Sequence, residues 1–119
     1  GKYIAPSVIE MKLSANENLE QVCVVGDGLP QPIALVVLTM EAIKKSKKNL
    51  LFSLNRTLDI VNSKFNSHEQ INNIVVLNQP WTIDNNLLTP TMKIKRNEID
   101  KLYKKEYQNW YEGNKINFV

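Results

Sequence analysis

The sequence predicts an α+β domain with a small sheet of about three strands, a short hairpin and flanking helices. Three short apolar runs rich in β-branched residues, at 22–25, 33–38 and 74–77, are typical of strands. Two longer segments, 40–65 and 97–112, repeat apolar residues at helical spacing. A chain of 119 residues with these elements is long enough for one modest core, so we expect a single domain.

Composition narrows the functional classes only slightly. Fifteen lysines and arginines against twelve acids give a net charge of +3, which suits a phosphate-bearing partner, including nucleic acid, without making the chain a polycation. The single cysteine, Cys23, rules out an internal disulfide framework and fits a reducing compartment. No apolar run is long enough to span a bilayer, and the first residues do not resemble a signal peptide.

The first element is expected to be a short helix. Pro6 suits its first turn, where the missing N–H costs nothing. Val8, Ile9 and Leu13 are then expected on the buried side, with Glu10 and Lys12 outside. Because the chain lacks an initiator methionine, we expect it to be part of a longer protein.

The next two strands, 22–25 and 33–38, are joined by a loop over 26–32 and predict a hairpin. Both runs are almost entirely apolar, so helices should cover both faces of the sheet. Cys23 in this setting is interpreted as a small core residue rather than a nucleophile. The only histidine, His68, lies in a polar stretch and offers it no evident base.

Segment 40–65 is predicted to be helical, with a break near 46–49 that divides it into two helices. The third strand, 74–77, ends before Pro80, because proline cannot donate a hydrogen bond to a strand ladder. A brief extended segment and a turn at 84–86 follow, and they predict the short hairpin.

The last helix is expected to begin with Asn97 as its N-cap and to stop at Gly113. The remaining residues, 113–119, are predicted to form a loose tail.

A cationic segment, 87–99, precedes this last helix and contains Lys93, Lys95 and Arg96. Lysines on a loop before a helix are well placed to meet an anion, but spacing alone favours a solvated basic turn, because loop lysines are mostly just exposed. The sequence has no glycine-rich phosphate loop, metal-ligand cluster or Ser-His-Asp arrangement. Pattern alone therefore predicts an α+β domain with a cationic loop.

Three stretches resemble one family. GKYIAPSVIE at 1–10, the hairpin over 20–38 and LLTPTMKIKRNEI at 87–99 are similar to the C-terminal domain of AMP-forming acyl-CoA synthetases, most closely the long-chain fatty acid branch. The resemblance extends from Gly1 to about Trp110, so we expect residues 1–112 to form this domain. The order and spacing of the three stretches make the resemblance specific.

The resemblance implies a ligase that works in two steps. ATP and a fatty acid give an acyl-adenylate and pyrophosphate, and the thiol of coenzyme A then displaces AMP. Magnesium would be bound by the phosphates rather than by this domain. The C-terminal domain would be a mobile lid that rotates over a large N-terminal AMP-binding domain, which lies outside this chain together with the hinge. We therefore expect the chain alone to lack ligase activity, and the intact protein to act in the cytoplasm or peripherally on the inner face of a membrane.

Lys93 falls at the position of the family's adenylation lysine. The carboxylate and the triphosphate repel each other, and charge moves onto the pyrophosphate as the new bond forms. A fixed ammonium between them lowers that barrier electrostatically. Many members have glycine immediately before this lysine, where the present sequence has Met92.

The resemblance also implies which residues contact coenzyme A and phosphate groups. Gly1 corresponds to the glycine of the thioester-forming loop along the pantetheine tunnel, and Lys2 and Tyr3 belong to the same loop. Lys95 and Arg96 are candidates for phosphate contacts, including those of coenzyme A, with surface solvation as the alternative.

A second hypothesis is a non-catalytic module that binds phosphate or nucleic acid. It draws on the net positive charge and on Tyr103, Tyr107 and Trp110, which could stack on bases if they were exposed beside Lys104 and Lys105. These rings share the apolar face of the last helix, so packing in the core is the expected use. We accordingly expect no nucleic-acid partner.

Overall fold

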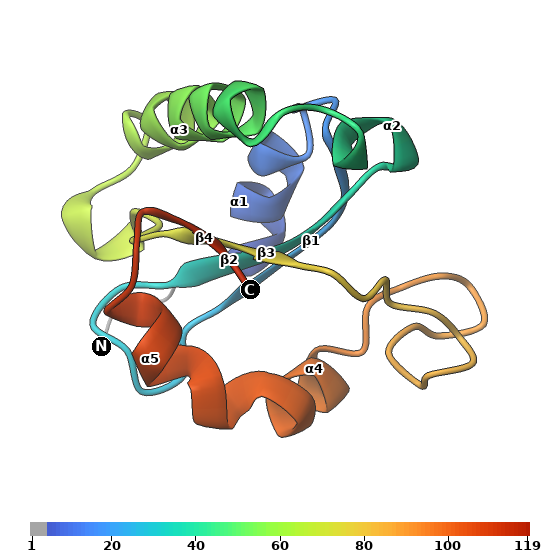
Figure 1. Ribbon diagram of the computed structural model, residues 1–119. Coiled ribbons are helices and arrows are strands. Elements are labelled where there is room, and N and C mark those ends of the chain that lie inside the picture. The colour runs from blue at the N-terminus through green and yellow to red at the C-terminus, as the bar shows by residue number, and fades with distance from the viewer. Residues whose placement is uncertain (1–4) are drawn as a thin grey trace.

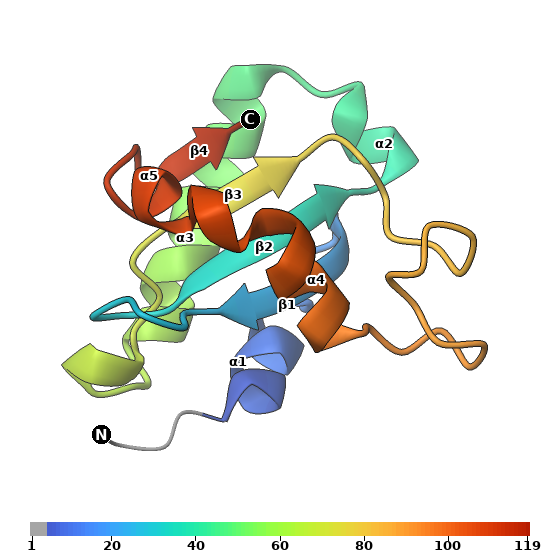
Figure 2. The same cartoon turned by 90° about the horizontal axis from the view of Figure 1, so that it is seen from below.

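The computed structural model describes residues 5–119 and contains a four-stranded sheet between two layers of helix (Figure 1). The strands are β1 (Leu19–Val25), β2 (Ile33–Leu38), β3 (Ile74–Leu77) and β4 (Ile116–Phe118), and they lie side by side in that order (Figure 2). β1 and β2 pair antiparallel, whereas β2–β3 and β3–β4 pair parallel. Each parallel pair is connected by a helical crossover, as such pairing requires.

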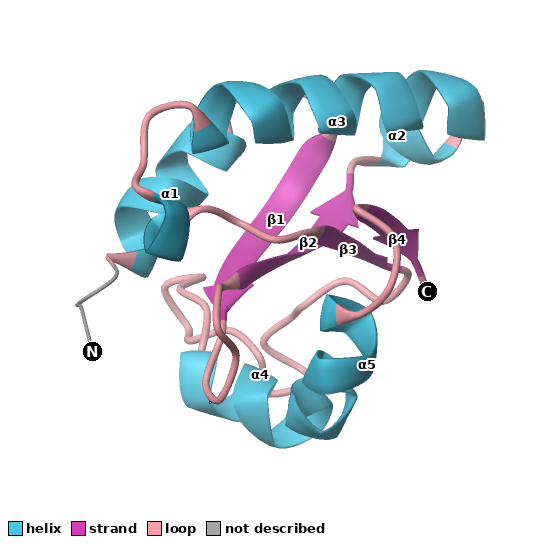
Figure 3. Cartoon of the chain, turned by 90° about the vertical axis from the view of Figure 1, so that its left-hand side faces the viewer, coloured by secondary structure: helices cyan, strands magenta, loops and turns pink. Residues whose placement is uncertain are grey.

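The helices divide between the two faces of the sheet (Figures 1 and 3). One face is covered by α1 (Pro6–Leu13) and α3 (Lys47–Asn62), with the short α2 (Met40–Ile43) leading into α3. The opposite face is covered by α4 (Arg96–Tyr103), the single 3₁₀ turn η2 (Lys104–Glu106) and α5 (Tyr107–Tyr111). A further 3₁₀ turn, η1 (Ser67–Glu69), lies between α3 and β3.

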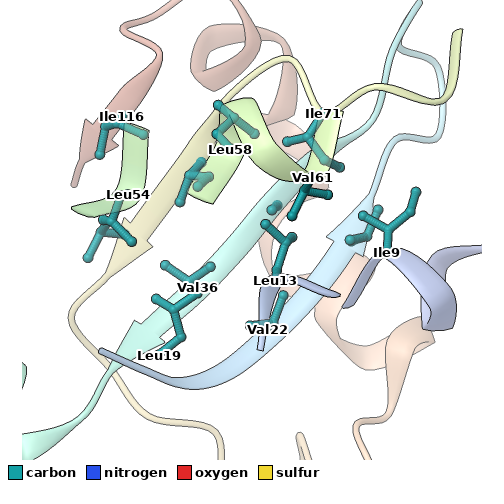
Figure 4. Close-up of a cluster of buried hydrophobic side chains, with 14 residues drawn as sticks. Ile9, Leu13, Leu19, Val22, Val36, Leu54, Leu58, Val61, Ile71 and Ile116 are labelled. Carbon is teal, nitrogen blue, oxygen red and sulfur yellow. The ribbon is translucent and has the colours of Figure 1, made fainter. Parts of the chain in front are cut away.

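Alternation along the strands explains why both faces are covered. In β1, Val22 and Val24 face the α1/α3 layer, whereas Cys23 and Val25 face the α4/α5 layer. β2 and β3 alternate in the same way, so each face has its own apolar cluster. Figure 4 shows the cluster under α1 and α3, which consists entirely of aliphatic side chains. The prediction of a sheet covered on both faces is thus confirmed.

Local signals place the first helices as expected. Pro6 occupies the first turn of α1, and Ile9 and Leu13 are buried. The prediction for Val8 was wrong, because this side chain is 42% exposed. Ser46 caps α3 by accepting a hydrogen bond from the Asn49 backbone N–H at 3.1 Å, so the helical segment divides close to the predicted break. The buried side of α3 consists of Leu50, Leu54, Leu58 and Val61.

The sheet has one more strand than expected, and the additional strand lies in the segment predicted to be a loose tail. β4 pairs with β3 in the register Ile74–Ile116, and the Val119 N–H donates to the Val76 carbonyl at 3.1 Å. Ile116 is buried in the α1/α3 cluster. Burial of this side chain and the ladder to β3 hold a segment that is too short to be recognised as a strand by its own pattern.

The last helical region also differs from the prediction. It begins at Arg96, with Lys95 rather than Asn97 at the N-cap position, and it is divided by η2. The Lys95 N–H donates to the Leu87 carbonyl at 2.9 Å, which holds the chain just before the helix. The turn expected at 84–86 forms and spans 83–86, but the antiparallel bridge of the hairpin lies beyond it, between Leu88 and Ile94.

Candidate functional site

The candidate site is the loop that joins β3 to α4, over residues 78–95, which projects from one end of the sheet (Figures 1 and 2). Its base is anchored by Trp81, Leu87 and Leu88, which are buried in the α4/α5 cluster. The Gln21 side chain of β1 makes two hydrogen bonds to the Trp81 backbone, at 2.8 and 2.9 Å. These contacts fix the base of the loop and leave its tip outside the core.

The tip is a tight turn from Thr89 to Lys93. The Thr89 N–H donates to the Lys93 carbonyl at 2.7 Å, and the Lys93 N–H donates to the Thr89 hydroxyl oxygen at 3.0 Å. Met92 has a φ of +68°, in the left-handed region that glycine adopts without strain. The backbone on both sides of Lys93 is therefore held by hydrogen bonds, and the residue before it has a conformation suited to glycine.

The side chain of Lys93 is exposed at this tip. Six ion pairs occur among residues 5–119, and Lys93 takes part in none of them. A braced backbone thus presents an ammonium group that the described carboxylates do not neutralise. Such a group can bind an anion delivered from outside the domain.

Lys95 lies closer to the body of the domain. Its Nζ donates to Asn86 Oδ1 at 2.6 Å, and the Asn86 amide donates in turn to Glu98 Oε1 at 3.3 Å. Lys95 is half-buried. It therefore connects the preceding turn to the first turn of α4.

Arg96 makes a bidentate ion pair with Glu10 of α1. Nη1 donates to Glu10 Oε2 at 2.6 Å and Nη2 donates to Oε1 at 3.0 Å. Nη1 also donates to the Val24 carbonyl at 2.9 Å. The hydrogen bond to Glu10 raises the pKa of the Arg96 guanidinium, while partial burial opposes the rise.

Sequence reasoning missed the part played by Glu10. Helical periodicity put this residue on the outer side of α1, but its side chain is only 15% exposed. Its partner Arg96 is 86 residues away in the chain, so no local pattern could have paired them. The only signal was an acid among apolar neighbours next to the buried Ile9.

Two further groups lie beside this ion pair. Cys23 is fully buried, 3.5 Å from Arg96 Nη1, and desolvation raises the pKa of its thiol to about 12, so the thiol stays protonated. A pocket of about 260 Å³ lies next to Arg96, which forms part of its lining together with Pro6, Gly26, Leu29 and Asp100, among others. The interpretation of Cys23 as a core residue agrees with this burial.

The aromatic residues of the last helical region pack inward. Tyr107 is buried and donates to Asp100 Oδ1 at 2.7 Å, and Tyr103 and Trp110 pack against the same cluster with their ring centroids 5.8 Å apart. A stacking platform for bases needs exposed rings, so these three do not form one.

Gly1, Lys2 and Tyr3 lie outside the described residues. Within residues 5–119, no group of three or more His, Cys, Asp or Glu side chains could hold a metal ion. None of the described helices is long and apolar enough to cross a bilayer.

Comparisons with known proteins agree with this geometry. Residues 1–115 match the family described as "AMP-binding enzyme C-terminal domain". Long-chain-fatty-acid–CoA ligase 5 of Rattus norvegicus is 32% identical over 133 residues, which cover 95% of this chain and 19% of that protein. The chain spans about a fifth of the length of the curated relatives it matches.

Two solved structures have the same fold. The adenylation domain of a carboxylate reductase from Mycobacterium chelonae has a TM-score of 0.81 and 24% identity, over 95% of this chain and 18% of that one. The didomain of a carboxylic acid reductase from Segniliparus rugosus, in complex with AMP, has a TM-score of 0.78 and 23% identity, over 92% of this chain and 16% of that one. Since the family match covers nearly the whole sequence, the chain belongs to the family of C-terminal domains of AMP-binding enzymes.

Proposed function

We propose that this domain serves an AMP-forming ligase that joins long-chain fatty acids to coenzyme A. Family membership supports the ligase class, and several relatives bear the name long-chain-fatty-acid–CoA ligase. In this proposal the domain acts as a mobile lid over an N-terminal AMP-binding domain of the same protein. ATP, a fatty acid and coenzyme A are the substrates, and magnesium is bound through the phosphates of ATP.

Lys93 is proposed as the catalytic residue of the adenylation step. A carboxylate oxygen of the fatty acid attacks the α-phosphorus of ATP, and the bond from that phosphorus to the pyrophosphate oxygen breaks. As the new bond forms, negative charge leaves the attacking carboxylate oxygen and accumulates on the departing pyrophosphate oxygen. The Lys93 ammonium stabilises that charge electrostatically, without transferring a proton.

The observation that carries this proposal is the turn around Lys93. Its hydrogen bonds with Thr89 hold the backbone, and its side chain extends into solvent with no described acid paired to it. The left-handed φ of Met92 also supports the register, because many family members have glycine at the position before the adenylation lysine. A shift of the motif by two residues would instead put Lys95 at that role, and Lys95 is engaged with Asn86.

The remaining assignments concern the second step. Gly1 is proposed to belong to the loop along the pantetheine tunnel, where the lack of Cβ allows close approach to a ligand. Lys2 and Tyr3 are proposed to lie on the same loop. Lys95 is proposed to contact a phosphate group. Arg96 is instead paired with Glu10 within the domain.

The test is Lys93→Ala in the full-length protein. The rate of the adenylation step, measured as the exchange of pyrophosphate into ATP, should fall about 100-fold or more. The reason is that one preorganised charge is lost from the transition state. Formation of acyl-CoA from supplied acyl-adenylate should change less than threefold. Lys105→Ala, which removes another exposed lysine, is the matched control and should leave both steps unchanged.

Equal losses in the two half-reactions would overturn the role of Lys93. The long-chain assignment is tested separately, by comparing kcat/KM for acetate, octanoate and palmitate in the unmodified full-length protein. A preference for acetate would remove the long-chain claim and leave the ligase class intact. Acyl-CoA formation by the 119-residue chain alone would contradict the need for the second domain.

A further inference from the structure

The ion pair between Glu10 and Arg96 lies against an open edge of the sheet. β1 is the first strand in the order β1-β2-β3-β4, so within residues 5–119 its outer side has no neighbouring strand. Such an edge presents backbone N–H and C=O groups that need partners. At Val24, the N–H donates to Glu10 Oε2 at 2.7 Å and the carbonyl accepts from Arg96 Nη1 at 2.9 Å. The two side chains therefore take the place that a neighbouring strand would occupy.

This arrangement connects three elements at one residue of β1. Glu10 belongs to α1, Val24 to β1, and Arg96 is the first residue of α4. Glu10 Oε2 accepts from both the Val24 N–H and Arg96 Nη1, so the three groups form a closed set of hydrogen bonds. The Arg96 side chain is 39% exposed and that of Glu10 only 15%, so the carboxylate lies on the inner side of the pair.

Among the described residues, side chains support the start of α4 at two points. Arg96 pairs with Glu10, and Glu98 accepts a hydrogen bond from the Asn86 amide at 3.3 Å, whereas no described side chain makes an N-cap hydrogen bond there. Arg96 comes only three residues after Lys93. A helix whose first residue is fixed by an ion pair also fixes the direction in which the preceding loop leaves it. The position of the Lys93 turn therefore depends on Arg96 at its α4 end and on the buried Leu87 and Leu88 at the other.

We propose that Glu10 is a positioning residue for Lys93, acting through Arg96 and the first turn of α4. The proposal rests on the function proposed above for Lys93. It gives Arg96 a role different from phosphate binding, because its guanidinium is aligned by Glu10 and Val24 within the domain. A small displacement of a charged group in an active site is enough to reduce the rate, since its effect depends on its distance from the reacting atoms.

The backbone of Val24 also requires the acid at position 10 and the base at position 96, rather than the reverse. Its N–H needs an acceptor and its carbonyl needs a donor, and both are met by Glu10 and Arg96 as they stand. In the exchanged pair, Glu10→Arg with Arg96→Glu, a guanidinium would face the N–H and a carboxylate would face the carbonyl. An ordinary surface ion pair tolerates such an exchange, whereas this one should not.

The experiment compares four variants of the full-length protein: Glu10→Gln, Arg96→Met, the two combined, and the exchanged pair. Each single variant should lower kcat for adenylation about tenfold, with the KM for ATP within twofold and thioester formation from supplied acyl-adenylate within threefold. The double variant should be no worse than either single variant, because both break one interaction. The exchanged pair should not recover activity.

A parallel loss in both half-reactions, or recovery by the exchanged pair, would overturn the proposal. So would a rise in the KM for ATP or coenzyme A with Arg96→Met while Glu10→Gln has no effect, because that result assigns Arg96 to phosphate binding.

A second measurement does not depend on the proposed reaction. In the 119-residue chain, Glu10→Gln should speed amide hydrogen exchange at Lys93 and Lys95 about tenfold, relative to the amides of β2 and β3. Unchanged exchange at those two amides would refute the positioning role. If Lys93→Ala leaves adenylation intact while this exchange increases, the proposed function fails and the structural coupling stands.

Discussion

The two faces of the sheet are built differently. The α1/α3 face is sealed by a 16-residue helix and a cluster of aliphatic side chains, whereas the α4/α5 face is covered by two short helices, a 3₁₀ turn and the loop at 78–95. The second cluster includes Trp81, Tyr107 and Cys23, and hydrogen bonds from the side chains of Gln21, Asn73 and Arg96 hold its covering segments in place. A continuous helix supplies rigidity on one side, and individual polar contacts position a protruding loop on the other.

This contrast separates stability from positioning. Apolar burial depends on area rather than direction, so the α1/α3 face can stabilise the domain without specifying where a side chain points. Hydrogen bonds are directional, and they occur where the loop of Lys93 meets the body of the domain. Substitutions on the first face should therefore change the free energy of unfolding most, and those on the second face should act mainly through local geometry.

The largest effect is expected from Leu54→Ala on the α1/α3 face. Leu54 is fully buried, so the substitution removes apolar contacts, leaves a cavity and should destabilise the domain by about 3 kcal/mol in urea denaturation. Leu102→Ala on α4 is the matched control, because Leu102 is 50% exposed and should cost less than about 0.5 kcal/mol. Equal losses would remove the distinction between the two faces.

A smaller loss is expected from Asn73→Ala, which breaks a polar contact behind α5. The Asn73 amide is buried and donates to the carbonyl oxygens of Trp110 and Asn114. The substitution removes the Asn73 donor from both carbonyls, although the Trp110 carbonyl still accepts from the Gly113 N–H at 3.0 Å, and it should cost about 2 kcal/mol. Asn109→Ala, on the exposed side of α5, should be near neutral in the same denaturation experiment. A cost below that of Asn109→Ala would show that polar anchoring matters little on this face.

Cys23 on the α4/α5 face should give the domain a measurable loss of stability in alkali. The folded thiol has a pKa of about 12 against an ordinary 9.0, so the unfolded chain loses this proton at lower pH than the folded chain. Its contribution is complete below pH 9 and is lost as the pH rises toward 12, with about 1 kcal/mol lost by pH 10. Denaturation of the unmodified protein and of Cys23→Ala at pH 8 and pH 10 measures this contribution. Between the two pH values, the free energy of unfolding should fall by about 1 kcal/mol less in the variant.

The smallest effect is expected at Met92, in the turn itself. Met92→Gly relieves a left-handed φ of +68° but adds freedom to the unfolded chain, so stability should rise by less than about 1 kcal/mol. Thr91→Gly, at a neighbour whose φ is not positive, should instead lower stability. Thermal unfolding of the two variants decides the matter, and a loss with Met92→Gly would argue against strain at this residue.

The sequence predicted those parts of the fold that depend on local pattern. The runs at 22–25, 33–38 and 74–77 are strands, the proline at position 6 begins α1, and the break expected near 46–49 separates α2 from α3. The prediction failed at β4, whose three residues are held by pairing with β3, a partner about 40 residues earlier. Such pairing is a property of the folded chain and leaves no periodic signal in so short a segment.

The candidate site shows the same division. A cationic loop around Lys93 was visible in the sequence, and its turn and exposure agree with that reading. The interruption of the last helix at Lys104–Glu106 was not visible, because no glycine or proline marks it. The ion pair of Arg96 with Glu10 depends on the edge of β1, which only the assembled sheet creates.

The order of the strands in space, β1-β2-β3-β4, is also their order along the chain. No strand has to insert between two that are already paired, so the sheet can grow outward from the β1–β2 hairpin as the polypeptide leaves the ribosome. Parallel pairing closes long loops and is the slower part of such assembly. We therefore expect β4 to acquire its hydrogen bonds last, and pulse-labelled refolding should find its amides protected after those of β1 and β2. Protection of the β4 amides would then mark the end of folding of the domain.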